Sequence, residues 1–134
     1  MNVILFESLE DRIALSREDR RAVHILDVLK RREGDLFDAG VVNGPRGKGT
    51  ITEIGAETIS VAFSWAAEPV PLDPLCLIIG LPRPQTARLL LRELTSLGVA
   101  AVHFVVTEKG EPNYGQSSLW HTGEWRRHVI AGVE

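Results

Sequence analysis

The sequence has very little cysteine, methionine or tyrosine, with one residue of each among 134. A lone cysteine excludes an intramolecular disulfide and a zinc site built on several cysteines. Cys76 stands in an apolar run, so we expect a buried, unreactive thiol there rather than a nucleophile. His121 and His128 have no ligand partners at metal spacing, and we therefore expect no metal site.

Long apolar runs are also missing. None approaches the roughly 20 residues of a membrane span, and the first residues lack the basic region and cleavage site of a signal peptide. We therefore expect a cytoplasmic protein without a membrane partner. The hydrophobic share of 44% is enough to fill the core of one ordinary domain or of two small ones, which excludes a disordered chain.

An excess of positive charge is the third absence. The net charge is -3, and this mildly disfavours nucleic-acid binding because affinity for phosphate normally requires a basic surface. Cationic residues nevertheless gather in the first half of the chain. They form three short clusters: Arg17 with Arg20 and Arg21, Lys30 with Arg31 and Arg32, and Arg46 with Lys48.

The first half alternates short apolar-patterned segments with glycine turns, which predicts a small β-barrel. The predicted strands cover residues 3–6, 36–42, 50–54 and 58–65. One face of the last strand is apolar and consists of Ile59, Val61, Phe63 and Trp65. Residues 43–49 lack the spacing of a P-loop. They predict either a hairpin tip or a flexible arm that presents Arg46 and Lys48 to phosphate.

A helix is predicted after Ser16, which can act as its N-cap, with Asp19 three residues later in an imperfect capping box. Four basic side chains then follow at spacings of three and four residues, so they can share one flank of the helix. They are Arg17, Arg20, Arg21 and His24. This flank is either a solvated face or a binding surface.

Composition changes between residues 66 and 74, where Pro69, Pro71 and Pro74 interrupt the β pattern. We place a domain boundary in this segment. The prediction is one domain at residues 1–68 and a second at 72–134, in a chain of the α+β class overall.

The second domain begins with the pattern of a βαβ unit: an apolar strand at 75–79, a helix that ends at Leu97 and a strand at 99–106. Continuous apolar runs predict strands covered on both faces, with His103 as a satisfied core histidine. Gly98 is expected to end the helix in a left-handed conformation. The apolar stripe of the helix consists of Ala87, Leu90, Leu91, Leu94 and Leu97.

Two short segments follow these strands, residues 81–83 after the first and 107–109 after the second. The carboxyl ends of parallel strands meet at one edge of a sheet, where open α/β sheets bind ligands. Arg83, Glu108 and Lys109 are therefore either part of a ligand site or ordinary loop charges at its rim.

A last helix is predicted from Thr122, with Trp125, Val129 and Val133 packed at spacings of four residues. Two parallel strands do not form a stable covered sheet by themselves. We therefore expect these residues to be the front part of a longer α/β domain.

Several segments, by their order and spacing, resemble the 16S ribosomal RNA uridine N3-methyltransferase family, enzymes of the SPOUT class. They are Arg21-x-x-His24-Ile25-Leu26-x-Val28-Leu29-Lys30 followed by Gly34-Asp35, Leu81-Pro82-Arg83, Leu97-Gly98-Val99, Thr107-Glu108-Lys109, and Tyr114-Gly115-Gln116-Ser117 leading to Glu124-Trp125-Arg126. Ser96 and Lys109 depart from the glutamate and arginine usual in the family, and lysine lacks the bidentate fork of arginine. The family's glycine-rich cofactor loop and the knot after it have no counterpart before Glu134.

The resemblance implies a PUA-like β-barrel that binds RNA, followed by the first part of a knotted α/β domain that binds S-adenosylmethionine. It implies methylation of N3 of a uridine, with 16S rRNA or the small ribosomal subunit as partner and a homodimer in the full-length protein. The candidate catalytic residues are Arg83, Glu108 and Lys109. The implied cofactor contacts are Leu81, Pro82, Thr107 and Glu108, and the implied contacts to the RNA backbone are Arg20, Arg21, His24, Arg46 and Lys48.

Two other functions stay open at this stage. Because the main cofactor loop has no counterpart, the chain alone is expected to be inactive, which leaves an RNA-binding fragment or module without catalysis as the alternative. A small-molecule-binding α/β protein would fit the net acidity, but it leaves the β-barrel and the basic loop unexplained.

Overall fold

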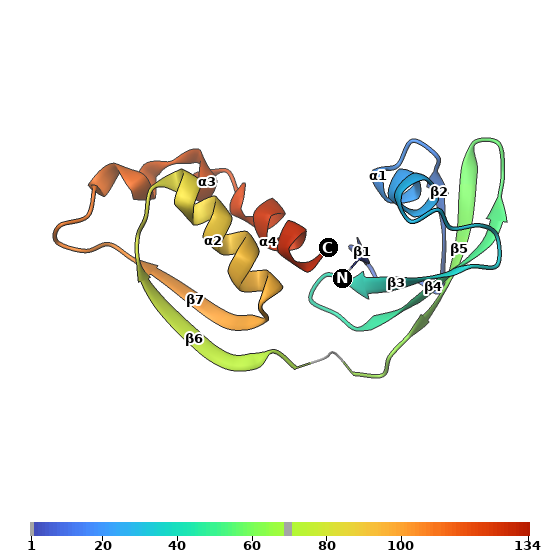
Figure 1. Ribbon diagram of the computed structural model, residues 1–134, viewed down its shortest axis with the longest axis horizontal. Helices are drawn as coiled ribbons and strands as arrows, with labels where there is room; N and C mark the ends of the chain where they lie inside the picture. The colour runs from blue at the N-terminus through green and yellow to red at the C-terminus, as the bar shows by residue number, and fades with distance from the viewer. Residues whose placement is uncertain (1, 69–70) are drawn as a thin grey trace. The chain divides into compact units, whose positions relative to one another are not determined.

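The computed structural model describes residues 2–68 and 71–134, which form two compact units on either side of residues 69 and 70 (Figure 1). Pro69, one of the three prolines in the predicted boundary, lies outside the described residues. In the part of the chain that the structure describes, no helix has both the length and the apolar character needed to cross a membrane.

The first unit is a curled five-stranded sheet in the order β1-β3-β4-β5-β2, in which β1 and β3 are parallel and the other neighbours antiparallel. Its strands are β1 (Val3–Phe6), β2 (Arg12–Ser16), β3 (Leu36–Val41), β4 (Arg46–Ile54) and β5 (Thr58–Trp65). Two short helical segments, α1 (Arg20–Val23) and η1 (His24–Val28), lie over the inner face. Ala22 and Ile25 of these segments share one buried cluster with Ile51 and Ile59, so the unit is a half-barrel closed over its own core.

The strand predicted at residues 58–65 is confirmed, including its apolar face. Ile59 and Val61 are buried, and Phe63 and Trp65 pack against the same cluster. The Phe63 and Trp65 rings stack with centroids 4.7 Å apart, and the Trp65 Nε1–H donates to the Glu10 carbonyl oxygen at 2.7 Å. The indole therefore has a polar partner beside its apolar contacts.

Two predictions for the helix of the first unit are wrong. Ser16 ends β2, a strand that the pattern did not reveal, and the N-cap of α1 is Asp19, whose carboxylate accepts from the Arg21 N–H at 2.8 Å. A helix that starts at Arg20 leaves Arg17 outside it, where its guanidinium donates to the Gly55 carbonyl at 3.3 Å. The four basic residues therefore do not share one helix flank.

The glycine-rich segment is not a flexible arm. β4 starts at Arg46, so the predicted arm shrinks to a turn around Asn43, which has φ +58°. Gly47 and Gly49 are strand residues, and both lie against other side chains. A Cβ at Gly47 would overlap the Ser64 carbonyl oxygen, and one at Gly49 would overlap the Phe37 ring. These glycines permit close packing in the β3–β4 hairpin. Of the two predictions for residues 43–49, the hairpin tip is therefore confirmed and the flexible arm is wrong.

The βαβ unit predicted for the second half is confirmed: β6 (Asp73–Gly80) and β7 (Val99–Val105) are parallel and joined by α2 (Pro84–Ser96). The chain continues through η2 (Pro112–Gln116), α3 (Ser118–His121) and α4 (Trp125–Val133), and α4 packs on α2.

The predictions for the helix ends of this unit have different outcomes. Gly98 has φ +76°, as a left-handed cap requires. Leu97 does not belong to the apolar stripe, because it follows the last residue of α2 and is 70% exposed. Thr122 is the C-cap of α3, so it does not start the last helix.

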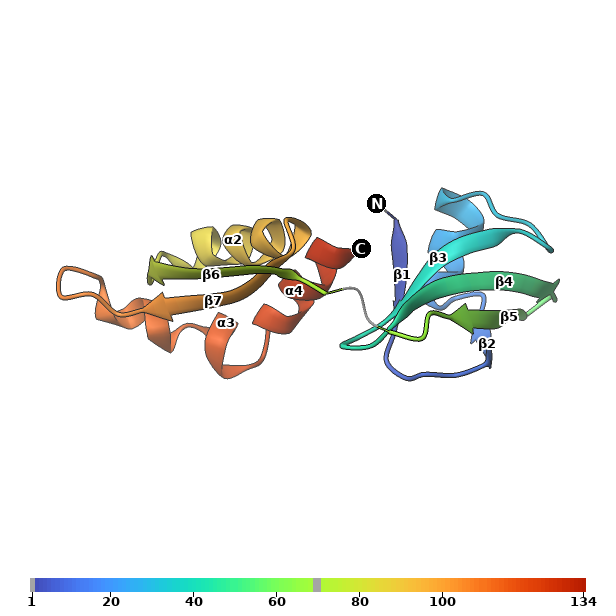
Figure 2. The same cartoon turned by 90° about the horizontal axis from the view of Figure 1, so that it is seen from below.

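The β6–β7 sheet is covered on one face only, so the prediction of strands covered on both faces is wrong, and two further predictions are wrong with it. Its helices lie to one side of the strands (Figures 1 and 2), and Ile78 on the other face is 75% exposed. Because strand side chains alternate, Cys76 and His103 share the bare face with Ile78, and both are exposed. Cys76 is therefore not a buried thiol, and His103 is not a core histidine.

Candidate functional site

The carboxyl ends of β6 and β7 bring the two predicted edge segments together. The Leu81 N–H donates to the Val105 carbonyl oxygen at 2.8 Å, so the pairing of the strands continues one residue beyond β6. A Cβ at Gly80 would come within 3.3 Å of Thr107 Cγ2. Residues 81–83 and 107–109 therefore lie at one edge, as the βαβ pattern predicts.

The three candidate catalytic side chains are all exposed at this edge. Arg83 is the N-cap residue of α2, and Glu108 and Lys109 lie in the turn closed by the Gly110 N–H and the Thr107 carbonyl at 2.9 Å. Among the described residues, none of these three side chains has an ion pair or a side-chain hydrogen bond. Their charges are thus available to a ligand. Residues 2–68 and 71–134 contain no cluster of three or more His, Cys, Asp or Glu side chains that could hold a metal ion.

Two buried polar atoms close to this edge have no hydrogen-bond partner within the described part of the protein: Ser117 Oγ and Trp120 Nε1. The Trp120 ring packs against Phe104 of β7 at 5.2 Å, and the neighbouring Gly115 approaches Leu81. Leaving a buried polar group unpaired costs about 1–3 kcal/mol, so a water or a ligand group that reached these atoms would be stabilised by hydrogen bonds to them. Sequence reasoning assigned no role to either residue; Ser117 entered only as the end of the Tyr114-Gly115-Gln116-Ser117 segment of the family resemblance, and Trp120 only as one of two aromatics in a polar segment.

A charge cluster around Glu124 ties α4 to α2. The Glu124 carboxylate accepts from Arg88 Nε at 2.8 Å and from Arg127 Nη2 at 2.9 Å, and it lies 3.3 Å from His128 Nε2. The hydrogen bonds from Arg88 and His128 lower the pKa of Glu124 to about 2. The same pair raises the pKa of Arg88. Glu124 therefore joins α4 to α2, the helices that cover the sheet.

We expect the second unit to lose stability as the pH falls from 4.5 toward about 2. The folded carboxylate has the lower pKa, so its contribution is complete above the ordinary pKa of glutamate and disappears as Glu124 becomes protonated. Glu124→Gln should remove this part of the pH dependence. Urea midpoints at about pH 6 and about pH 3 measure it. Glu93→Gln, an exposed position of α2, should leave the dependence intact.

The candidate RNA contacts in the first unit have different surroundings. Arg21 is held by Asp19, with 2.6 Å between Nη2 and Oδ2, and it lies 5.1 Å from the centroid of the Phe6 ring. This pairing lowers the pKa of Asp19. Lys48 pairs with Asp38 at 2.7 Å across β3 and β4, but both side chains are more than half exposed. Arg20 and Arg46 are exposed, and His24 is half-buried at the start of η1. Arg21 is thus committed to the fold, while Lys48 can exchange its partner at little cost.

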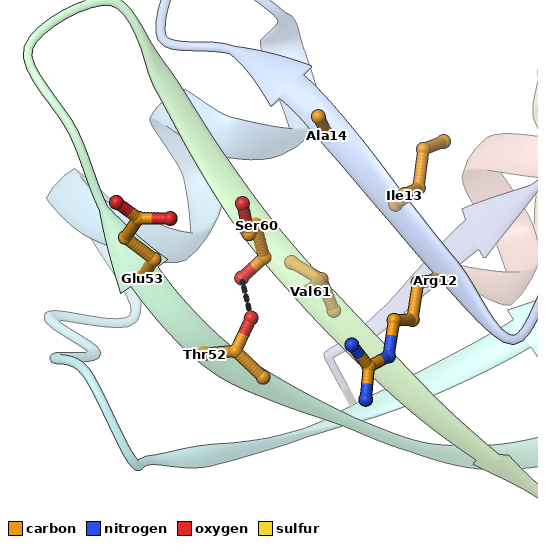
Figure 3. A pocket seen from close by; sticks show the side chains of 7 residues that line it. All are labelled: Arg12, Ile13, Ala14, Thr52, Glu53, Ser60 and Val61. Atoms are coloured by element: carbon orange, nitrogen blue, oxygen red, sulfur yellow. Dashed lines mark hydrogen bonds between the residues drawn. The ribbon is translucent and has the colours of Figure 1, made fainter.

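A shallow depression of about 420 Å³ lies on the outer face of β2, β4 and β5 (Figure 3). Its polar lining comes from Arg12, Thr52, Glu53 and Ser60. Sequence reasoning missed it, because its residues come from three strands, one of them unpredicted.

Comparison with known proteins identifies relatives of both units. The chain is 38% identical over 138 residues to the ribosomal RNA small subunit methyltransferase E of Treponema pallidum, a match that spans 100% of this chain and 52% of that protein. It is 28% identical over 133 residues to the ribosomal RNA small subunit methyltransferase E 1 of Borreliella burgdorferi, spanning 99% of this chain and 56% of the relative. The chain therefore spans about half the length of the curated relatives that it matches.

The fold also matches a solved structure, that of a ribosomal RNA small subunit methyltransferase E from Neisseria gonorrhoeae bound to S-adenosyl methionine. The TM-score is 0.67 at 19% identity, with 100% of this chain and 56% of that chain covered. Residues 68–134, half of the sequence, match the family described as the RNA methyltransferase domain. This match includes every described residue of the unit that carries the edge, and the chain belongs to the RNA methyltransferase family.

Proposed function

We propose that this chain is part of an S-adenosylmethionine-dependent enzyme that methylates N3 of a uridine in 16S rRNA. One observation carries the proposal: the segment that matches the RNA methyltransferase family contains the edge where residues 81–83 meet residues 107–109. The names of its two curated relatives, and the cofactor bound to its structural neighbour, support the substrate class and the cofactor.

The residues at the edge fit this cofactor. Leu81 and Pro82 offer an apolar wall, and Thr107 and Glu108 offer polar groups. The unpaired Ser117 hydroxyl can donate or accept a hydrogen bond, and the unpaired Trp120 Nε1–H can donate one to a ligand. We assign these residues to cofactor binding. When bound, the cofactor supplies a methyl carbon that bonds to N3 of uracil while the carbon–sulfur bond breaks and its electron pair goes to sulfur.

The protein has two tasks in this reaction. The target uridine must be unpaired or flipped out, and its N3 must lose a proton. We assign to Arg83 and Lys109 the stabilisation of the negative charge that develops on the uracil ring, and to the Glu108 carboxylate the acceptance of the proton. Each of these charges is free of a protein partner in the described residues, which suits a role toward substrate.

We propose further that residues 1–68 are a PUA-like RNA-binding domain and residues 72–134 the front part of a SPOUT domain, in a protein that forms homodimers. The second candidate function is RNA binding without catalysis, which the exposed cations of β4, Arg46 and Lys48, favour. Calorimetry with S-adenosylmethionine separates the two. Saturable binding in the micromolar range would favour the enzyme, and its absence would favour the binding module.

Disruption of the gene that encodes the chain tests the activity in the cell. We expect N3-methyluridine to disappear from nuclease digests of 16S rRNA, and restoration of the gene with Glu108→Gln to leave it strongly reduced. Mass spectrometry of the nucleosides measures both, with the other methylated nucleosides as internal controls. An unchanged level of N3-methyluridine after disruption would refute the proposed activity.

Removal of the two cations of β4 tests RNA binding by the first unit. Arg46→Ala combined with Lys48→Ala should lower the affinity for rRNA and make the slope of log affinity against log salt shallower by about 1–2. The matched control is Arg31→Ala combined with Arg92→Ala, which removes the same charge from exposed positions elsewhere. Equal losses of rRNA affinity in the two double variants would mean that the cations of β4 are not part of the binding surface.

A further inference from the structure

A β-bulge decides which side chains of β4 point outward beside the depression. Ile51 pairs with Val61 and Glu53 with Ser60, so Thr52 is an extra residue in β4. Ile51 is fully buried and Ile54 packs on the core, whereas Thr52 and Glu53 are both exposed. Strict alternation would have pointed Glu53 to the same side as Ile51. The bulge therefore places two neighbouring polar side chains on the outer face.

The strands next to the bulge provide a floor of small side chains. Ser60 pairs with Glu53 on one side and with Ala14 on the other, and Ala62 pairs with Arg12. The Thr52 hydroxyl donates to the Ser60 carbonyl oxygen at 3.1 Å, which fixes the extra residue in place. Figure 3 shows Arg12 and Glu53 on opposite sides of Ser60. The depression thus has a cation at one side, a carboxylate at the other and small groups between them.

The two charges at this depression are unpaired. Among residues 2–68 and 71–134, neither Arg12 nor Glu53 has an ion pair or a side-chain hydrogen bond, in contrast to Arg21 and Lys48 of the same unit. A ligand with an anionic group and a hydroxyl donor would satisfy both. A ribonucleotide has this combination, because its phosphate matches a guanidinium and its 2′-hydroxyl can donate to a carboxylate.

The openness of the depression limits what it can bind. Its volume lies at the low end of the range for small-ligand sites, about 300–1,000 Å³. Arg12, Ala14, Thr52 and Glu53 are exposed, so the site cannot enclose most of a free small molecule. A nucleotide within a polymer is also kept at the site by the contacts that its neighbouring nucleotides make with the protein, so it does not need an enclosed pocket.

We propose that this depression binds one nucleotide of an RNA strand, with a phosphate on Arg12 and the 2′-hydroxyl donating to the Glu53 carboxylate. The inference rests on the proposed function, because it takes RNA as the substrate. It adds a site on the outer face of the first unit and assigns to Glu53 the discrimination of RNA from DNA.

Fluorescence anisotropy with a single-stranded RNA of about 12 nucleotides, and with the DNA of the same sequence, tests the site. At about 50 mM salt, Arg12→Gln should weaken RNA binding about tenfold and make the salt slope shallower by about 0.7. Arg92→Gln, an exposed position of α2, should change the affinity less than about twofold. Circular dichroism establishes that each variant is folded.

Glu53→Gln should lower the preference for RNA over DNA about tenfold, while Glu93→Gln leaves that preference unchanged. Free uridine monophosphate should show no saturable binding. The inference is overturned if Arg12→Gln weakens RNA binding no more than Arg92→Gln, if Glu53→Gln keeps the preference, or if the unaltered chain binds RNA and DNA equally. The level of N3-methyluridine after gene disruption is independent of these outcomes, so the proposed activity is judged separately.

Discussion

Gly49→Ala should destabilise the first unit by about 3 kcal/mol, a large part of the stability of a small domain. Gly49 lies between Phe37 of β3 and Phe63 of β5, and a Cβ there would overlap Phe37 Cζ and come within 2.8 Å of Cε1 and Cε2. Phe37 is 3% exposed, so its ring has no free space to move into. Alanine restricts the unfolded chain more than glycine does, but this gain is only about 0.5–1 kcal/mol. The steric term therefore wins.

Urea unfolding followed by tryptophan fluorescence measures this loss, and hydrogen exchange with mass spectrometry assigns it to residues 2–68, because Trp120 and Trp125 of the second unit also contribute to the fluorescence. Gly115→Ala is the control, because a Cβ there makes only an ordinary contact, 3.5 Å from Leu81 Cδ2. A Gly49→Ala chain as stable as the unaltered one would mean that the Phe37 ring does not occupy the space beside Gly49.

Gly132→Ala should destabilise the second unit although alanine is the better helix former. The preference for alanine over glycine in a helix is worth at most about 1 kcal/mol. A Cβ at position 132 would overlap the Arg92 carbonyl oxygen of α2 and lie 3.0 Å from Thr95 Cβ. A backbone carbonyl cannot move aside as a side-chain tip can, so α4 must shift away from α2 and lose packing. We expect a net loss of about 2 kcal/mol.

Ala131→Gly in the same helix measures the propensity term directly, since Ala131 is exposed. Ala131→Gly should lower the free energy of unfolding by up to about 1 kcal/mol. If α2 and α4 were not in contact, Gly132→Ala would raise the free energy of unfolding by the same amount. Stabilisation by Gly132→Ala would therefore contradict the close approach of α2 and α4. Exchange of backbone amides in residues 84–96 and 125–133 gives the location of the change.

Local patterns predicted elements whose environment is uniform along the segment. The alternation from Ile59 to Trp65 and the stripe from Ala87 to Leu94 are both present in the structure, because each faces one apolar surface. The patterns failed where a long-range contact decides the conformation. The pattern left residues 43–49 open between a hairpin tip and a flexible arm, yet Gly47 and Gly49 are strand residues opposite Trp65 and Phe63. Residues Arg12–Ser16 have no strand pattern of their own, and they form a strand because they pair with β5.

The candidate site divides in the same way. The position of residues 81–83 and 107–109 at one edge follows from the βαβ pattern, because the ends of parallel strands must meet. The unpaired Ser117 Oγ and Trp120 Nε1 do not follow from it, since being unpaired depends on what surrounds an atom. The cluster of Arg88 with Glu124 joins positions 36 residues apart, and no local spacing predicts such a pair.

The sequence by itself determined most strands of the β-rich half, the βαβ unit of the second half, and a resemblance to RNA methyltransferases that the family match supports. Periodicity and motif spacing contain that information because they depend on neighbouring residues. Only the tertiary structure decided that Cys76 and His103 lie on a bare face, that Arg21 lies over the Phe6 ring, and that Arg12 and Glu53 flank one depression. These properties depend on which distant segments pack together and which faces they leave uncovered.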